Sequence, residues 1–200
     1  TLLTLPALFT AAVSLFYFLL PVRWATRLPV AVAYAVGMYA LLLTENIYNV
    51  AAERGIGLLR AAQSVGFLLT LVADFLLLFT IFSFRLPIFV TAALVAVVSG
   101  LLLIQSLWSY ELGVKISPKI GEIVMVLTII FFEMTWVLLF WPIKPILIAL
   151  LLTSGFYSLA GMAQQYIVEK LYKKTMIEFL TVWCIVFVLA LSTARWRGPV

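Results

Sequence analysis

Two carboxylic acids stand inside long apolar runs, where a charged group is costly. Asp74 lies within LLTLVADFLLLF and Glu133 lies within TIIFFEMTWVLLF. A charged side chain at the centre of a membrane helix costs roughly 2.5–3.5 kcal/mol, so we expect both acids to face the interior of a helix bundle. Every Lys and Arg lies near the end of an apolar run, which leaves neither acid a cation at its own depth.

Acids placed in this way can serve two purposes. In pumps and transporters, buried carboxyl groups carry protons or bind cations. In other membrane proteins, a protonated acid donates or accepts a hydrogen bond with Ser, Thr or Gln on a neighbouring helix and holds the two helices together. The sequence leaves both interpretations open for Asp74 and for Glu133.

A polar stretch, TENIYNVAAERGIGLLRAAQ, separates two apolar runs near the middle of the first half of the chain. Glu45 and Asn49 lie one helical turn apart, so they share a face of one helix. A hairpin in this stretch brings Arg60 and Gln63, on the next helix, to a similar depth. We therefore predict a polar patch between two helices, which acts either as a binding site or as a clamp that holds the hairpin together.

Small and polar residues also recur on one face of the stretch LTSGFYSLAGMAQQY. Ser154, Ser158, Gly161 and Gln165 follow one another at spacings of four, three and four residues. Small residues let membrane helices approach closely, and Gln can bond across the contact. The face is either a packing surface or the polar lining of a solute site, for which Gln165 is the candidate binding residue.

The composition assigns the chain to the membrane. Of its 200 residues, 66% are hydrophobic and 10% are charged, and the mean hydropathy is +1.21. Ordinary globular domains carry about 25% charged residues. We expect an integral protein of the cell membrane with no soluble domain.

Prolines near the ends of the apolar runs divide the chain into helices. The spans we predict are residues 2–20, 28–50, 58–84, 86–108, 120–141, 146–168 and 175–194. They form a single transmembrane domain over 1–200, an all-α polytopic transmembrane helix bundle of seven helices. The number falls to six if the second and third helices do not both cross.

Two further patterns concern the arrangement of these helices. The stretches LFYFLLPVRWATRLP and WVLLFWPIKP resemble each other weakly, which would fit a 3+1+3 parallel repeat. Lys and Arg residues divide almost evenly between the two ends of the predicted bundle, so the positive-inside rule does not select an orientation.

Several classes of protein are disfavoured by what the sequence lacks. It has no His, one Cys (Cys184) and one Asp. A disulfide within the chain, a His and Cys metal cluster, a haem with an axial His and a Ser–His hydrolase all need residues that are missing. No basic stripe with interleaved aromatic residues indicates nucleic-acid binding. We expect a protein that is not an enzyme and holds no metal or cofactor.

The stretch LLLTENIYNVAAERGIGLLRAAQSVGFLLTL, with the run through FSFRLP, resembles uncharacterised multi-pass membrane proteins of candidate-phyla bacteria. The resemblance extends over most of the chain and implies a bacterial inner-membrane protein. It implies no activity, cofactor or partner.

The function we expect from these residues is transport or binding of a small solute or ion by the buried acids. Two alternatives stay open: a sensor module that feeds a domain beyond the given chain, and a structural or assembly partner in a membrane complex. The expected partners are the lipid bilayer, a small solute or ion, and other membrane proteins.

Overall fold

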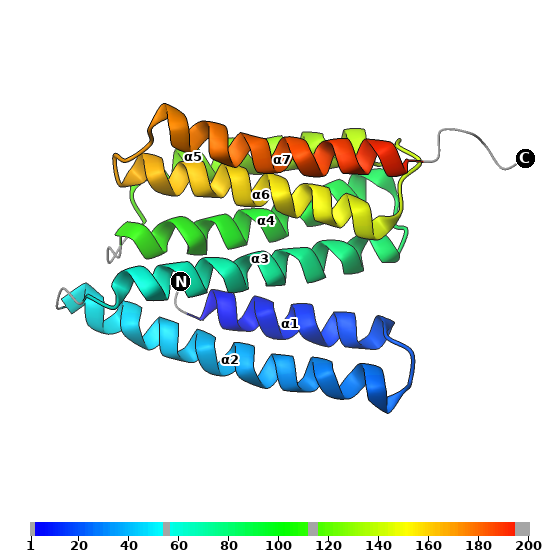
Figure 1. Cartoon of the computed structure of the whole chain (residues 1–200), viewed down its shortest axis with the longest axis horizontal. Coiled ribbons are helices and arrows are strands. Elements are labelled where there is room, and N and C mark those ends of the chain that lie inside the picture. The colour runs from blue at the N-terminus through cyan, green and yellow to red at the C-terminus, as the bar shows by residue number, and fades with distance from the viewer. Residues whose placement is uncertain (1–2, 54–56, 112–115, 195–200) are drawn as a thin grey trace, which may run out of the picture.

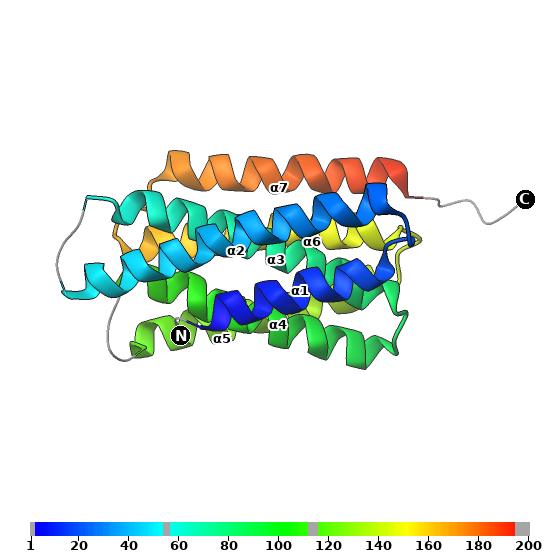
Figure 2. The ribbon, with the colours of Figure 1, turned by 90° about the horizontal axis from the view of Figure 1, so that it is seen from below.

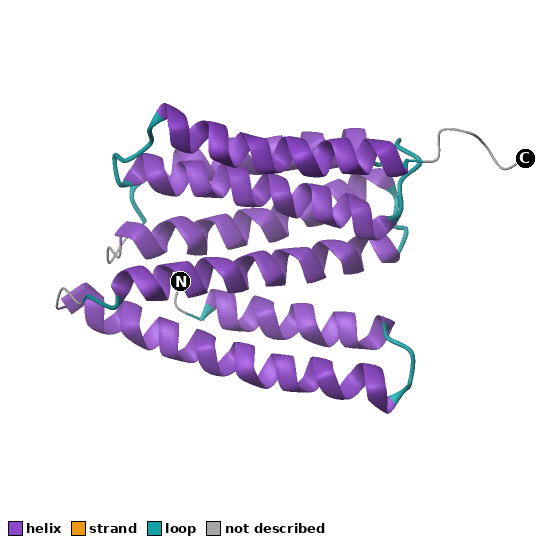
Figure 3. Cartoon of the chain, viewed as in Figure 1, coloured by secondary structure: helices purple, strands orange, loops and turns teal. Residues whose placement is uncertain are grey.

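The computed structural model describes residues 3–53, 57–111 and 116–194 and shows seven helices and no strand among them (Figures 1 and 3). The bundle confirms the predicted all-α fold. The helices are α1 (Thr4–Leu19), α2 (Trp24–Glu53), α3 (Leu59–Ser83), α4 (Ile88–Glu111), α5 (Pro118–Leu138), α6 (Pro145–Ile167) and α7 (Lys173–Thr193).

Prolines and local hydrogen bonds set several helix ends. Pro118 and Pro145 each occupy the first position of a helix, where the missing N–H costs no hydrogen bond. The Ser117 hydroxyl accepts a hydrogen bond from the backbone N–H of Ile120 at 3.4 Å and caps α5. After α3, Arg85 adopts a left-handed backbone conformation with φ of 49° and ends the helix before Pro87.

The helices run nearly parallel or antiparallel in two layers (Figures 1 and 2). One layer contains α2, α3, α6 and α7 in spatial order, and the other contains α1, α4 and α5. The turns between α1 and α2, α3 and α4, and α5 and α6 lie together, on the right in Figure 1; we call this the α1–α2 end. The opposite side is the α2–α3 end.

The core lies where α3, α4 and α6 meet. Each of these helices packs against four others, and Leu78, Leu102, Leu103, Leu152 and Phe156 are fully enclosed among them. By contrast, α7 packs mainly against α6, and Ala190 is its one buried residue among those described. The outer faces of α2 and α7 are apolar and exposed, as expected for surfaces that contact lipid.

Six of the described helices are long and apolar enough to cross a membrane, and they run from α2 to α7. The shorter apolar helix is α1, with 16 residues. The second and third helices, α2 and α3, both have spanning length. The second helix begins earlier than the predicted residue 28, because α2 starts at Trp24 and contains Pro29.

The two helix triplets of the predicted 3+1+3 repeat pack differently. Each of α1, α2 and α3 packs against the other two, whereas α5 and α7 each pack against α6. The weak sequence similarity between the triplets thus has no counterpart in equivalent packing.

Candidate functional site

A buried contact between Glu45 on α2 and Gln105 on α4 forms the centre of a polar cluster. The Gln105 Nε2 group donates a hydrogen bond to Glu45 Oε1 at 2.9 Å. The residues are 8% and 2% exposed, respectively. Glu45 Oε2 and Gln105 Oε1 are also buried, and neither has a hydrogen-bond partner among the described residues. Two acceptor oxygens are thus left without a donor in the interior of the bundle.

Tyr48, one turn after Glu45, connects α2 to α3. Its hydroxyl donates a hydrogen bond to the backbone oxygen of Ala62 at 3.1 Å. The hydroxyl lies directly over Gly66, where a Cβ atom would be only 2.5 Å away. Since real Cβ contacts are essentially never this short, glycine at this position is what allows α2 and α3 to approach so closely.

Gln and Ser side chains on α3, α4 and α6 extend the cluster. The Gln63 Nε2 group on α3 donates to the backbone oxygen of Ser109 on α4 at 3.0 Å. The Gln164 Nε2 group on α6 donates to the Ser106 hydroxyl on α4 at 2.7 Å. We use the term polar cluster for the residues that these bonds join: Glu45, Tyr48, Gln63, Gln105, Ser106, Ser109 and Gln164.

The polar cluster borders a cavity of about 10 Å³. Tyr48, Gln105, Ser106 and Ser109 line it together with Thr70. This volume is about what one water molecule requires. The cavity is therefore far smaller than the several hundred Å³ of a typical pocket for a small organic ligand.

Asp74 lies deeper, near the middle of α3, and is fully buried. The Thr153 hydroxyl on α6 donates a hydrogen bond to Asp74 Oδ2 at 2.8 Å. The second carboxyl oxygen of Asp74, Oδ1, is buried and has no hydrogen-bond partner in the described part of the chain. The neutral partner expected for this acid is thus a Thr on a neighbouring helix.

Thr70 lies between the cavity and Asp74 on α3. It lines the cavity, and it precedes Asp74 by four residues, about 6 Å along the helix axis. Gly66, level with Tyr48, lies about 12 Å from Asp74 along the same axis. Thr70 is therefore the one polar side chain of α3 between Gly66 and Asp74, and its hydroxyl donates to the backbone oxygen of Gly66.

The prediction that Glu133 faces the bundle interior was wrong. Its side chain is exposed on the outer side of α5, where it borders an apolar groove of about 270 Å³. Trp183 and Phe187 of α7 form the other wall of this groove. The face of α5 that packs inward carries Leu127, Phe131 and Thr135, and Glu133 falls between these positions.

The predicted patch of Glu45, Asn49, Arg60 and Gln63 is only partly brought together. Glu45 and Gln63 belong to the polar cluster, whereas Asn49 and Arg60 are exposed. Asn49 is turned outward because Tyr48, its neighbour, takes the inward position on α2. Among the described residues, no Lys or Arg side chain forms a salt bridge with either buried acid.

On α6, the inward amide belongs to Gln164 rather than to Gln165. Gln164 is buried and bonded to Ser106, and Gln165 is half-buried. Ser154, Ser158 and Gly161 are buried as the packing interpretation predicted. The Ser158 hydroxyl donates to the backbone oxygen of Phe179 on α7 at 2.8 Å.

The sequence reasoning missed Gln105, Ser106 and Ser109, the α4 part of the cluster. They stand together in LLLIQSLWSYE, where three polar residues close an apolar run. A Gln inside a predicted membrane helix, three residues before its end, was the available signal, because a buried amide requires partners. The part of the chain that the structure describes contains no group of three or more His, Cys, Asp or Glu residues suited to a metal ion.

A protein-family model matches residues 1–193, and the family is described as a protein of unknown function (DUF5656). No curated protein and no solved structure matches the chain.

Proposed function

Because the chain belongs to this family of unknown function, we propose its function from the site: it moves protons, or a small cation in their place, through the membrane by way of Glu45 and Asp74. One observation carries the proposal. Each acid is buried, is held through one oxygen by a neutral donor, and keeps its second oxygen unpaired.

The energetics favour exchange of a single positive charge at these carboxyl groups. An ionised acid inside the bundle without a cation is costly. Binding of a proton or a small cation neutralises the acid and removes much of that cost. Gln105 and Thr153 are neutral, so they orient the carboxyl groups without permanently compensating their charge.

The dimensions of the cluster favour an ion over an organic solute. A cavity of about 10 Å³ accommodates no metabolite, whereas a proton needs only a succession of hydrogen-bonding groups. Thr70 provides a hydroxyl group between the depth of Glu45 and that of Asp74. Ser106 and Ser109 provide hydroxyl groups from the depth of Glu45 toward the α2–α3 end.

In the proposed pathway, Glu45 and the other residues of the polar cluster lie on the α2–α3 side of Asp74. On the opposite side of Asp74, the buried face of α3 is mostly apolar, with Leu77, Leu78 and Ile81. Thr80 is also buried there, and its hydroxyl donates to the backbone oxygen of Leu76 on its own helix. In the proposed cycle, a change in helix packing gives Asp74 access to the α1–α2 end. One-sided access to an acid near the middle of the membrane is what an alternating-access mechanism requires. No covalent chemistry is needed, and the proposal includes no enzymatic step.

The direct test uses the purified chain in proteoliposomes that contain a pH-sensitive dye. A potassium diffusion potential drives proton uptake, and parallel vesicles test sodium uptake. We expect flux of one of these ions well above that of protein-free vesicles. Asp74→Asn and Glu45→Gln should each reduce it at least about tenfold, because the amides cannot exchange a proton.

Glu133→Gln is the matched control, since it removes an exposed acid outside the polar cluster. We expect it to leave the flux unchanged. Asn at position 74 retains an oxygen that can accept from Thr153, so size-exclusion profiles should show a folded variant. Wild-type vesicles that move neither ion, or a folded Asp74→Asn variant with full flux, would refute the proposal.

A second candidate is a structural or assembly partner, which the exposed surface of α7 favours. Ala190 is the one buried residue among those described on this helix, and Cys184 lies on its outer side. A spin label on Cys184 would report close approach between copies in a bilayer. In this role the buried acids only connect helices, and Asp74→Asn would leave assembly intact.

A further inference from the structure

The α1–α2 end of the bundle is basic. Arg23, Arg27, Arg85 and Lys144 lie in or beside its described turns, and no Asp or Glu does. The acid that comes nearest along the helices is Glu133, five residues inside α5. The other described carboxylates lie near the middle of the bundle or toward the α2–α3 end. Anions that approach the α1–α2 end therefore encounter guanidinium and ammonium groups without competing carboxylates.

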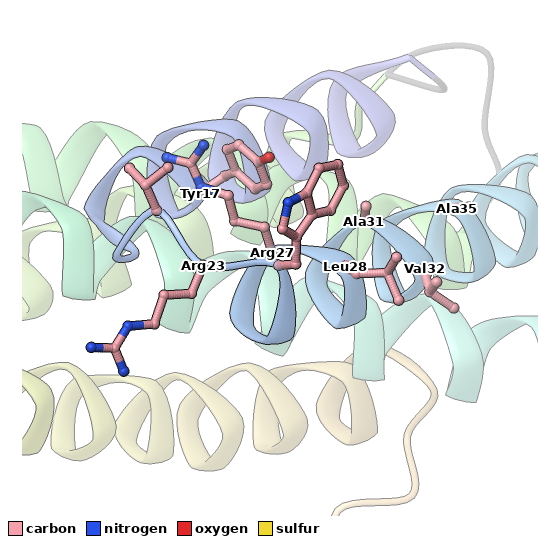
Figure 4. A pocket seen from close by; sticks show the side chains of 9 residues that line it. Tyr17, Arg23, Arg27, Leu28, Ala31, Val32 and Ala35 are labelled. Atoms are coloured by element: carbon pink, nitrogen blue, oxygen red, sulfur yellow. The ribbon is translucent and has the colours of Figure 1, made fainter.

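At this end a groove of about 520 Å³ lies beside the α1–α2 turn (Figure 4). Arg27 leans against Tyr17, with its Cζ atom 4.8 Å from the centre of the ring, and Arg23 extends away from that pair. The aromatic ring holds the Arg27 guanidinium in place through a cation–π contact. Arg27 Nε is buried and has no hydrogen-bond partner among the described residues.

From Arg27 the groove continues as an apolar track along the outer face of α2. Leu28 and Val32 line the groove, and with Val36 they form an exposed row at intervals of one turn. Their exposed fractions are 58%, 55% and 64%. From Trp24, at the mouth, to Val36 the row is about 18 Å long, a length suited to an acyl chain.

We propose that this groove binds an anionic glycerophospholipid, with its phosphate on Arg27 and one acyl chain along Leu28, Val32 and Val36. The Arg27 guanidinium lines the groove, and a guanidinium forms charge-assisted, often bidentate, hydrogen bonds with a phosphate. The apolar track favours a lipid over a free phosphate, because a soluble anion has no acyl chain to cover Leu28, Val32 and Val36. This site is separate from Glu45 and Asp74, so it does not depend on the proposed ion transport.

Native mass spectrometry of the detergent-solubilised chain tests the proposal by titration with phosphatidylglycerol or with phosphatidylcholine of the same acyl chains. We expect the first phosphatidylglycerol to bind about tenfold more tightly than phosphatidylcholine. Arg27→Gln should reduce the phosphatidylglycerol affinity about tenfold, as expected for the loss of a hydrogen bond to a charged group. It should leave the phosphatidylcholine affinity unchanged.

Arg85→Gln is the matched control, because it removes an exposed charge from the same end outside the groove. It should change the phosphatidylglycerol affinity less than twofold. Equal losses in both variants would mean a general effect of charge and would overturn the site. Inorganic phosphate at millimolar concentration should not displace the lipid; full displacement would indicate a small-anion site instead. The lipid preference of the wild-type chain needs no variant, and its absence would also overturn the proposal.

Discussion

Neutral side chains hold both buried acids in the same way, through one oxygen. An amide holds Glu45 and a hydroxyl holds Asp74, and each contact joins two helices that are distant in sequence. Hydrogen bonds of this kind inside membrane proteins average about 0.6 kcal/mol and reach about 1.7 kcal/mol. Their contribution to stability is therefore modest, while the position that they give to a carboxyl oxygen is well defined.

Removal of one partner from the Glu45–Gln105 contact should cost more than removal of both. Gln105→Leu leaves the Glu45 carboxyl buried without a donor, and we expect it to lower the free energy of unfolding by about 1–2 kcal/mol. In the double variant Glu45→Leu, Gln105→Leu, part of that loss should be regained because no polar group is left unpaired. Denaturant unfolding in mixed micelles measures both values.

Asn49→Leu provides the control for this cycle, since Asn49 is exposed on the same helix. Its effect should stay within about 0.5 kcal/mol. Strictly additive losses in the double variant would show that Glu45 and Gln105 are not energetically coupled.

At the scale of helices, α7 packs mainly against α6, and Phe179 is central to that contact. Gly161 lies against the Phe179 ring, and the Ser158 hydroxyl bonds to the Phe179 backbone. Tyr157 adds a ring contact with Phe179 at 5.1 Å between centroids. Phe179 therefore connects α7 to successive turns of α6, which accounts for an outer helix with so little buried surface.

Gly161→Ala should loosen this attachment. The added methyl group collides with the Phe179 ring, and overpacking of this kind costs about 1–3 kcal/mol. We expect faster hydrogen exchange along α7 with little change in α3 and α4. Gly121→Ala is the matched control, because a Cβ atom there meets nothing within 4 Å. Gly121→Ala should be neutral or stabilise α5 by up to about 1 kcal/mol. Equally fast hydrogen exchange along α7 in both variants would contradict the role given to the contact between Gly161 and Phe179.

At the scale of the whole molecule, the apolar runs were sufficient to predict the bundle and the approximate bounds of its helices. The inward faces were harder to predict. A soluble helix exposes polar residues on one side, but a membrane helix is apolar all round, so its periodicity gives little information about which side is buried. Glu133 was placed inside because a charged group in a membrane is costly, yet its side chain is exposed. Gln165 was chosen over its neighbour Gln164, which is the buried one.

The same limitation explains the partial success at the site. Glu45, Gln63 and Asp74 were recognised because polar residues in apolar surroundings are conspicuous. Their partners Gln105 and Thr153 come from helices that are adjacent only after folding. No local pattern identifies which helices of a bundle are neighbours, so these contacts needed the structure.

Because α2 is long, the thickness of the membrane should affect the polar cluster. Its 30 residues span about 45 Å, whereas the 24 residues of α4 span about 36 Å. A helix longer than the hydrocarbon layer tilts to fit, and it tilts more in a thinner bilayer. Figure 2 shows α2 crossing obliquely over its neighbours. Glu45 lies on this longest helix and Gln105 on a shorter one, so a change in tilt acts directly on their hydrogen bond.

We therefore expect ion flux in proteoliposomes to pass through an optimum as lipid chains are lengthened from 14 to 22 carbons, about the range that varies the hydrocarbon thickness around 30 Å. Glu45→Gln should abolish both the flux and its dependence on chain length. A wild-type flux that stays constant across the series would show that the tilt of α2 does not affect transport. In a cell, the protein would then respond to the lipid composition of its membrane as well as to the ion gradient across it.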